Sequence, residues 1–187
     1  MSAVTRRQLL NAGRRVFARL GFDGARVDLI AREAGVNKAL INYHFRGKEG
    51  LYREVLAEEL RGATEALESR LAAEHSAERR LLAWPAALAA LLEERPTLAP
   101  LLLGEGLRGG PGLDPDALPG EALLARTLGE ARGDGRLPPL ETADLQPVLL
   151  GTVLLAGLQG SAAPAATLLA GLLERGLLTP PTDTGDR

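Results

Sequence analysis

Hydrophobic and polar positions recur along almost the whole chain with the spacing of a helix. No segment shows sustained apolar–polar alternation with β-branched residues, so the pattern predicts an all-α fold without a sheet. The predicted helices cover residues 5–20, 27–34, 38–44, 48–73, 77–94, 96–107, 120–132, 141–162 and 164–176. The 48–73 helix has an apolar stripe at Leu51, Val55, Leu56, Leu60, Ala63, Leu67 and Leu71, and an opposite, solvated face at Glu58, Glu59, Arg61, Glu65 and Arg70.

Two short helices joined by a tight turn are predicted between Arg26 and Leu51. Gly35 can end the first helix in a left-handed conformation, and Asn37 can cap the second by accepting from backbone N–H groups two or three residues on. The second helix turns Ile41 and Phe45 inward and leaves four residues outward: Lys38, Ala39, Asn42 and Tyr43. Such a helix fits the major groove of DNA, although an ordinary helical hairpin with a solvated face has the same pattern.

These residues resemble the N-terminal DNA-binding domain of the TetR family of bacterial transcriptional regulators. The resemblance rests on Phe17 in the first helix, the GF at 21–22, IAREAGV at 30–36, YHF at 43–45 and KEGLY at 48–52. It covers about a quarter of the chain. One departure is that Ala25 and Arg26 stand where the family usually has a Ser or Thr that caps the second helix and touches a phosphate.

The resemblance implies a three-helix helix-turn-helix DNA-binding domain over residues 1–50 and a helical-bundle ligand and dimerisation domain over residues 51–178. Residues 179–187 would form a disordered tail. It further implies a homodimer, most often a repressor, that binds a palindromic double-stranded DNA operator. The residues implied on DNA are Arg26, Val27, Lys38, Ala39, Asn42, Tyr43, His44 and Lys48. Lys38, Ala39 and Asn42 would read bases, whereas Tyr43, His44 and Lys48 would position the DNA backbone.

The distribution of charge agrees with a DNA-binding N-terminus. Residues 1–54 hold 11 Lys+Arg and 5 Asp+Glu, a balance of +6, whereas residues 55–187 hold 11 and 19, a balance of −8. A basic lobe on an acidic body is typical of a protein that binds the phosphate backbone. The overall net charge of −2 conceals this asymmetry.

Residues 145–173 contain no charged side chain. Two adjacent helices that are apolar nearly all round have to be buried, and three burial sites are open: a dimer interface, the core of one subunit, or a membrane. Polar residues and Pro164 interrupt the span, which argues against the membrane. The resemblance favours a homodimer interface through about residues 141–177.

Nothing in the sequence points to catalysis. His44 and His75 lie far apart, there is no cysteine, and the familiar hydrolase, metalloprotease and nucleotide-binding motifs are absent. We therefore expect no enzyme activity, no cofactor and no metal site, and the lack of an N-terminal apolar run after Arg6 and Arg7 favours a cytoplasmic protein over a secreted one. The alternatives are an all-α enzyme or ligand carrier with a structural N-terminal lobe, and an effector-free DNA binder or activator.

The C-terminal body offers little information about an effector. Beyond Tyr52 its one aromatic residue is Trp84, so a pocket there consists of aliphatic side chains and predicts a small apolar effector rather than a stacked aromatic cation. The residues expected at the pocket are Trp84, Leu88, Leu103 and Leu107. Residues 104–120 hold six glycines and three prolines, which predicts a long loop, either a lid or a plain connection.

Overall fold

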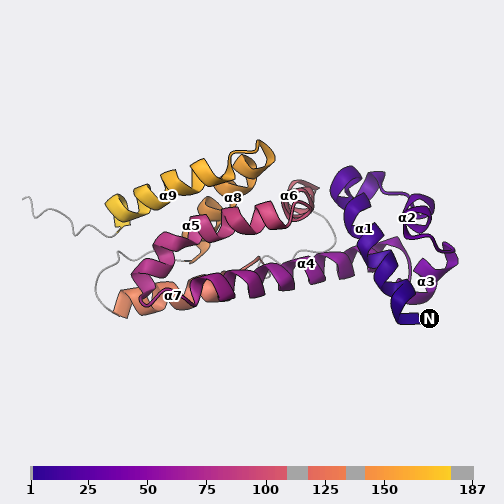
Figure 1. Ribbon diagram of the computed structural model, residues 1–187, viewed down its shortest axis with the longest axis horizontal. Helices are drawn as coiled ribbons and strands as arrows, with labels where there is room; N and C mark the ends of the chain where they lie inside the picture. Colours follow the sequence, from indigo (N-terminus) through magenta and orange to yellow (C-terminus); the bar gives the residue numbers. More distant parts are fainter. Residues whose placement is uncertain (1, 109–117, 134–141, 178–187) are drawn as a thin grey trace, which may run out of the picture. The chain divides into compact units, whose positions relative to one another are not determined.

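The computed structural model describes residues 2–108, 118–133 and 142–177 of the chain (Figure 1). Every regular element in these ranges is an α-helix, which confirms the predicted all-α fold. The helices are α1 Ser2–Gly24, α2 Val27–Ala34, α3 Ala39–Phe45, α4 Lys48–Leu71, α5 Ala77–Glu94, α6 Leu98–Arg108, α7 Glu121–Gly133, α8 Thr142–Leu158 and α9 Ala162–Leu177. Each corresponds to a predicted helix, with ends that differ by a few residues. The predicted disordered tail lies outside the described residues.

The helices form two compact units. Unit 1 comprises Met1–Gly62 with Arg95–Leu118, and unit 2 comprises Ala63–Glu94 with Pro119–Arg187. The division falls inside α4, and it places α6 with the N-terminal helices. The functional boundaries expected from the resemblance, 1–50 and 51–178, stay predictions.

The core of unit 1 is formed where α1, α2, α3 and the start of α4 meet. Its fully buried side chains include Leu9, Phe17, Ile30, Ile41, Leu51 and Tyr52. The Tyr52 ring stands edge-on to Phe17, with ring centroids 4.8 Å apart. Leu101 of α6 joins the same core, since α6 packs against α1. Burial of large apolar side chains from five helices is what stabilises the position of α3.

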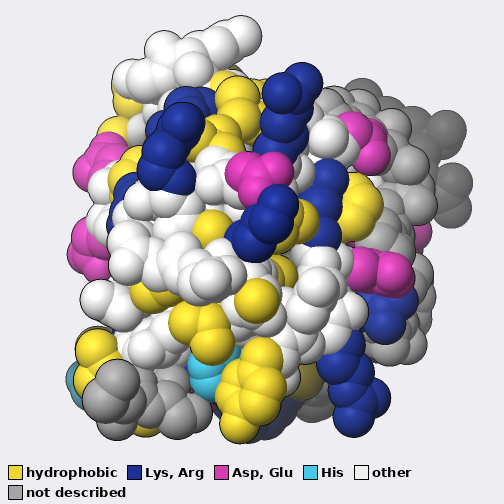
Figure 2. All heavy atoms as spheres, turned by 90° about the vertical axis from the view of Figure 1, so that its right-hand side faces the viewer, with side chains coloured by type: hydrophobic (Ala, Val, Ile, Leu, Met, Phe, Trp, Pro, Cys, Tyr) yellow, Lys and Arg dark blue, Asp and Glu magenta, His cyan; other side chains and the backbone are white. Residues whose placement is uncertain are grey.

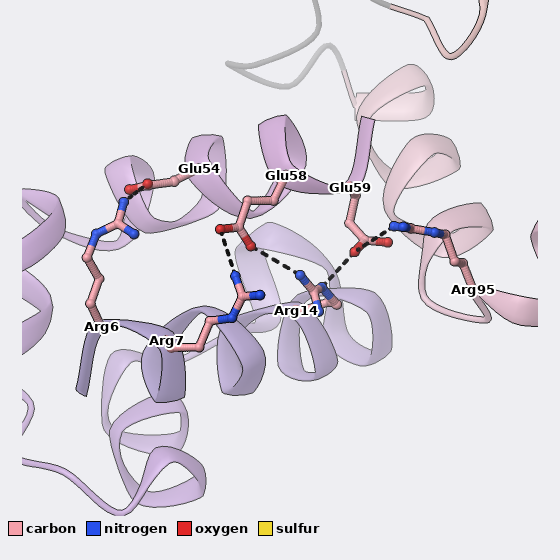
Figure 3. Close-up of polar contacts among 7 residues, drawn as sticks. All are labelled: Arg6, Arg7, Arg14, Glu54, Glu58, Glu59 and Arg95. Atoms are coloured by element: carbon pink, nitrogen blue, oxygen red, sulfur yellow. Dashed lines mark hydrogen bonds and ion pairs between the residues drawn. The ribbon is translucent and has the colours of Figure 1, made fainter. Parts of the chain in front are cut away.

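A network of ion pairs links α1 to α4 within unit 1 (Figure 3). Glu59, expected on a solvated face, is only 3% exposed, so that expectation is wrong. Its Oε1 lies 2.7 Å from Arg14 Nε on α1 and 3.8 Å from Arg95 Nη1 just before α6. A buried carboxylate is tolerated only with such partners, and these arginines lie far from Glu59 in the sequence.

The same network of ion pairs includes further arginines of α1. Glu58 lies 3.3 Å from Arg7 and 3.2 Å from Arg14, and Arg6 pairs with Glu54. Gly62 leaves room for Arg95, because a Cβ at position 62 would meet the Arg95 guanidinium at 2.6 Å. The carboxylates of α4 therefore neutralise arginines that the sequence counted towards a basic DNA-binding face.

In unit 2, α5 packs against α7, α8 and α9. The predicted apolar stripe of α4 runs from Leu51 in unit 1 to Leu71 in unit 2 and is buried at every position. Trp84 of α5 is buried beside Gly120, whose backbone is left-handed at φ 78° and where a Cβ would meet the indole ring at 2.9 Å. A glycine at position 120 thus lets the chain pass close to the only tryptophan.

The uncharged span of residues 145–173 has two faces. Leu149, Val153, Leu154, Leu169 and Leu173 are buried within the unit, whereas five large apolar side chains are exposed: Val148, Leu155, Leu158, Leu168 and Leu172. We call these five residues the exposed apolar face. The break between α8 and α9 comes at Gly160, with φ 70°, rather than at Pro164. Among the described helices, none combines the length and apolar character that a membrane crossing requires.

The prediction of a loop over residues 104–120 is wrong at its start. Helix α6 continues to Arg108, so Gly104 and Glu105 are helical, and Glu105 is buried. Packing of neighbouring leucines such as Leu101 into unit 1 outweighs the low helix propensity of glycine. Residues 109–117 lie outside the described residues.

Candidate nucleic-acid interface

The turn between α2 and α3 has the geometry that the sequence predicted. Gly35 is left-handed at φ 68° and ψ 29°, and its N–H donates to the carbonyls of Ala31 and Arg32. Asn37 Oδ1 accepts from the N–H of Ala39 at 2.8 Å, which caps the start of α3. Two local signals therefore fix the angle at which α3 leaves α2.

Helix α3 has one buried and one exposed face. Ile41 and Phe45 are buried in the core of unit 1. The exposed residues are Lys38, Ala39, Asn42 and Tyr43, which confirms the predicted orientation of all four. Lysine and asparagine are among the side chains that read base edges, so this face can contact DNA.

His44 and Lys48 are held at the end of α3 and the start of α4. His44 is half-buried, and its ring stands edge-on to Tyr43, with centroids 4.9 Å apart. Lys48 Nζ donates to the Asp23 carbonyl at 3.4 Å and lies 4.4 Å from the centroid of the Phe22 ring. These contacts restrict the conformations of both side chains.

Arg26 and Val27 differ in how accessible they are. Arg26 is exposed at the N-cap of α2 and makes no side-chain cap, as its departure from the family pattern suggested. Val27 is half-buried against the core of unit 1. Arg26 is thus free to reach a phosphate, whereas a DNA contact by Val27 would use only part of its side chain.

Most basic side chains of residues 1–54 are engaged in ion pairs. The pairs beyond the α1–α4 network are Arg15–Glu33, Arg19–Glu33, Lys38–Asp28 and Arg53–Glu49. In the described part of unit 1, no ion pair involves Arg26, Arg32 or Arg46, all of them exposed. Figure 2 shows the end of unit 1 formed by the N-terminal helices, where Lys and Arg side chains alternate with Asp and Glu. The basic surface is therefore smaller than the +6 balance indicated.

The residues expected at an effector pocket are divided between the two units. Trp84 and Leu88 are buried on α5 in unit 2. Leu103 lies on α6 in unit 1 and is half-buried, and the side chain of Leu107 is outside the described residues. A pocket shared by these four residues stays a prediction. The described ranges also hold no group of three or more His, Cys, Asp or Glu side chains placed to bind a metal.

Sequence reasoning overlooked two residues near this interface. Asp28, in the first turn of α2, pairs with the predicted base reader Lys38. Gly50, in α4, allows close approach to α3, because a Cβ there would lie 1.8 Å from the Phe45 carbonyl oxygen. A carboxylate followed ten residues later by a lysine is too common to be noticed, and the crowding at Gly50 depends on how α3 is packed.

Comparison with known proteins identifies the N-terminal helices. Residues 9–55 match the family model for bacterial regulatory proteins of the tetR family. The HTH-type transcriptional regulator BetI of Vibrio vulnificus is 44% identical over 61 residues, which are 33% of this chain and 31% of that protein. The match to this curated relative thus spans about a third of its length.

Solved structures extend the similarity to the fold of most of the chain. The transcriptional regulator FadR from Bacillus subtilis, solved in complex with stearoyl-CoA, is 20% identical with a TM-score of 0.72, covering 89% of this chain and 96% of that one. A putative transcriptional regulator from Saccharomonospora viridis, solved with choline, is 22% identical with a TM-score of 0.73, covering 94% and 98%. The chain therefore shares with both proteins the fold of a helix-turn-helix domain followed by a helical body. The sequence similarity to the tetR family thus lies in residues 9–55, in the first helices of unit 1.

Proposed function

We propose that this protein is a transcriptional repressor. It binds a palindromic DNA operator as a homodimer and releases it when a small molecule binds. The exposed face of α3, with Lys38, Ala39, Asn42 and Tyr43, is the observation that carries the proposal. Its position beside Lys48 and the unpaired Arg46 gives base-reading groups a basic border. A DNA-binding role also implies a cytoplasmic location.

The homodimer is proposed through α8 and α9, within residues 141–177. The exposed apolar face places five large apolar side chains on α8 and α9, whereas the surface of a monomer usually carries such side chains singly. A second copy of the chain would cover this face. Two copies would present two α3 helices to successive major grooves, about 34 Å apart on DNA. The competing proposals are a helical enzyme or carrier and an effector-free DNA binder, and a gel shift with a palindromic duplex separates the first of these from a regulator.

Substitutions at Asn42 and Lys48 should distinguish the reading of bases from binding to the DNA backbone. We expect Lys48→Ala to weaken binding to operator and random duplex alike and to make the salt slope shallower by about 1, because one phosphate contact is lost. Asn42→Ala should lose roughly 1–3 kcal/mol of discrimination at one or two base pairs. Both follow from titrating an operator selected from a random pool against a scrambled duplex at several salt concentrations. Equal losses on both duplexes for Asn42→Ala would remove it from the base-reading residues.

An effector is expected to be apolar. Trp84 is the only aromatic side chain beyond Tyr52, so unit 2 lacks the aromatic cage that a quaternary ammonium favours. We therefore expect stearoyl-CoA, the ligand of the Bacillus subtilis FadR, to change Trp84 fluorescence and to release operator DNA over the same concentration range. Choline should do neither at millimolar concentration. A tenfold loss of DNA affinity corresponds to about 1.4 kcal/mol of coupling.

Trp84→Phe provides the control for this measurement. It should abolish the fluorescence signal and leave the release of DNA measurable by gel shift. Release by choline and not by the acyl-CoA would contradict the apolar pocket, and release by neither compound nor by a wider set of apolar ligands would favour the effector-free alternative.

A further inference from the structure

An acidic side chain lies among the residues that are proposed to read bases. Asp28 in the first turn of α2 and Lys38 at the N-cap of α3 form an ion pair, with 2.9 Å between Oδ1 and Nζ. The two side chains are 74% and 67% exposed, so the pair contributes little to stability. Near DNA a carboxylate repels phosphates, which makes its presence beside a base-reading lysine costly unless it accepts a hydrogen bond from a base.

The hydrogen-bonding groups of the pair match one edge of a base pair. The ammonium of Lys38 only donates, and the carboxylate of Asp28 only accepts. In the major groove guanine offers the acceptors O6 and N7, and cytosine offers the donor N4. O6 and N4 are themselves joined by a hydrogen bond, so they lie about 2.9 Å apart, close to the Nζ–Oδ1 distance. Lys38 and Asp28 can therefore contact both bases without leaving each other.

The other base pairs fit this arrangement less well. In the reversed pair, with cytosine under Lys38, two donors face each other and two acceptors face each other. With thymine under Lys38 and adenine under Asp28 the order of donor and acceptor is right, but a methyl group replaces the second acceptor that guanine offers. The pair thus prefers one G·C orientation, tolerates one orientation of A·T, and rejects the reversed G·C pair.

We propose that Asp28 and Lys38 form a single reading unit that selects one oriented G·C base pair in each half-site. Lys38 donates to guanine, and Asp28 accepts from cytosine N4 and disfavours any base that presents an acceptor at that place. This inference rests on the proposed DNA-binding function. It gives an acidic residue of α2 a role in sequence specificity, in addition to the exposed residues of α3.

The test uses the full-length protein and the operator that it selects from a random pool. Each base pair of one half-site is replaced in turn by the other three, and affinities are measured for wild type, Asp28→Ala, Lys38→Ala and the double variant. Wild type should prefer G·C over C·G at one position by at least about tenfold. Asp28→Ala should reduce that preference to about threefold or less, keep all other preferences, and tighten binding to random duplex. Lys38→Ala should lose the preference at the same position, and the double variant should lose no more of it than Lys38→Ala alone.

Glu49→Ala is the matched control. Glu49 is also an exposed carboxylate in the first turn of a helix, paired with Arg53 at 2.6 Å and adjacent to Lys48. Its removal should tighten binding to all duplexes alike and change no base preference. If the wild type selects an operator but Asp28→Ala behaves like Glu49→Ala, the reading unit is wrong and the proposed function is unaffected. A wild-type protein that selects no DNA overturns the proposed function and this inference together.

Discussion

Replacing Leu155 and Leu168 together with arginine is expected to convert a dimer into monomers and to lower operator affinity by at least about 100-fold. Leu155 on α8 and Leu168 on α9 are 57% and 62% exposed, so arginine at either site leaves unit 2 folded. Desolvating two charges in each copy would oppose association through the exposed apolar face. The two half-sites of the operator would then be bound separately, and the gain from binding both at once would disappear.

Sedimentation at low micromolar concentration and operator titration measure this prediction. Val4→Arg is the control, since Val4 is an equally exposed apolar residue of α1 and should leave the sedimentation coefficient unchanged. A wild-type protein that sediments as a monomer, or a double variant that remains a dimer, would place the homodimer elsewhere or remove it.

The choice of these leucines required the structure. From the uncharged span alone, Leu154 and Leu169 are equally good targets, yet both are buried within unit 2 and arginine there would unfold the unit. Residues of a nearly uniformly apolar helix give no periodic contrast between the face that packs inside a subunit and the face that is exposed. Sequence could therefore locate the apolar helices and not their two faces.

Local signals account for what the sequence predicted well. The left-handed Gly35, the Asn37 cap and the inward Ile41 and Phe45 each depend on residues within one or two helical turns. These positions determine the exposed face of α3, which is why its outward residues could be named in advance. Periodicity shows which way a side chain points, and it cannot show which partner it meets, as the pairing of Lys38 with Asp28 illustrates.

Contacts between distant segments account for what the sequence missed. Glu59 follows a hydrophilic pattern on α4, and only Arg14 and Arg95, brought together by packing, make its burial acceptable. In the same way, α6 extends through Gly104 because it packs against α1. Charge counts along the sequence overestimated the basic surface for this reason, since acids beyond residue 54 neutralise arginines before it.

Gly50→Ala should lower the free energy of unfolding of unit 1 by about 3 kcal/mol, at the upper end of the usual cost of overpacking. The added Cβ would lie 1.8 Å from the Phe45 carbonyl oxygen and 3.0 Å from its carbonyl carbon. Both are backbone atoms, so no side chain can rotate away. Helix α3 would have to move from α4 and disturb the turn at Arg46 and Gly47, where φ is 60° and 113°.

Urea unfolding followed by two signals tests this prediction. Far-UV circular dichroism reports both units, and Trp84 fluorescence reports unit 2. We expect the circular dichroism transition of Gly50→Ala to begin at a urea concentration lower by about 1 M or more, with the Trp84 transition little changed. Gly104→Ala is the control, because outside its own helix backbone no atom of the described residues lies within 4 Å of the added Cβ, and alanine favours the helix by up to about 1 kcal/mol. If Gly50→Ala unfolds like the wild type, α3 and α4 are not in the close contact that determines the position of α3.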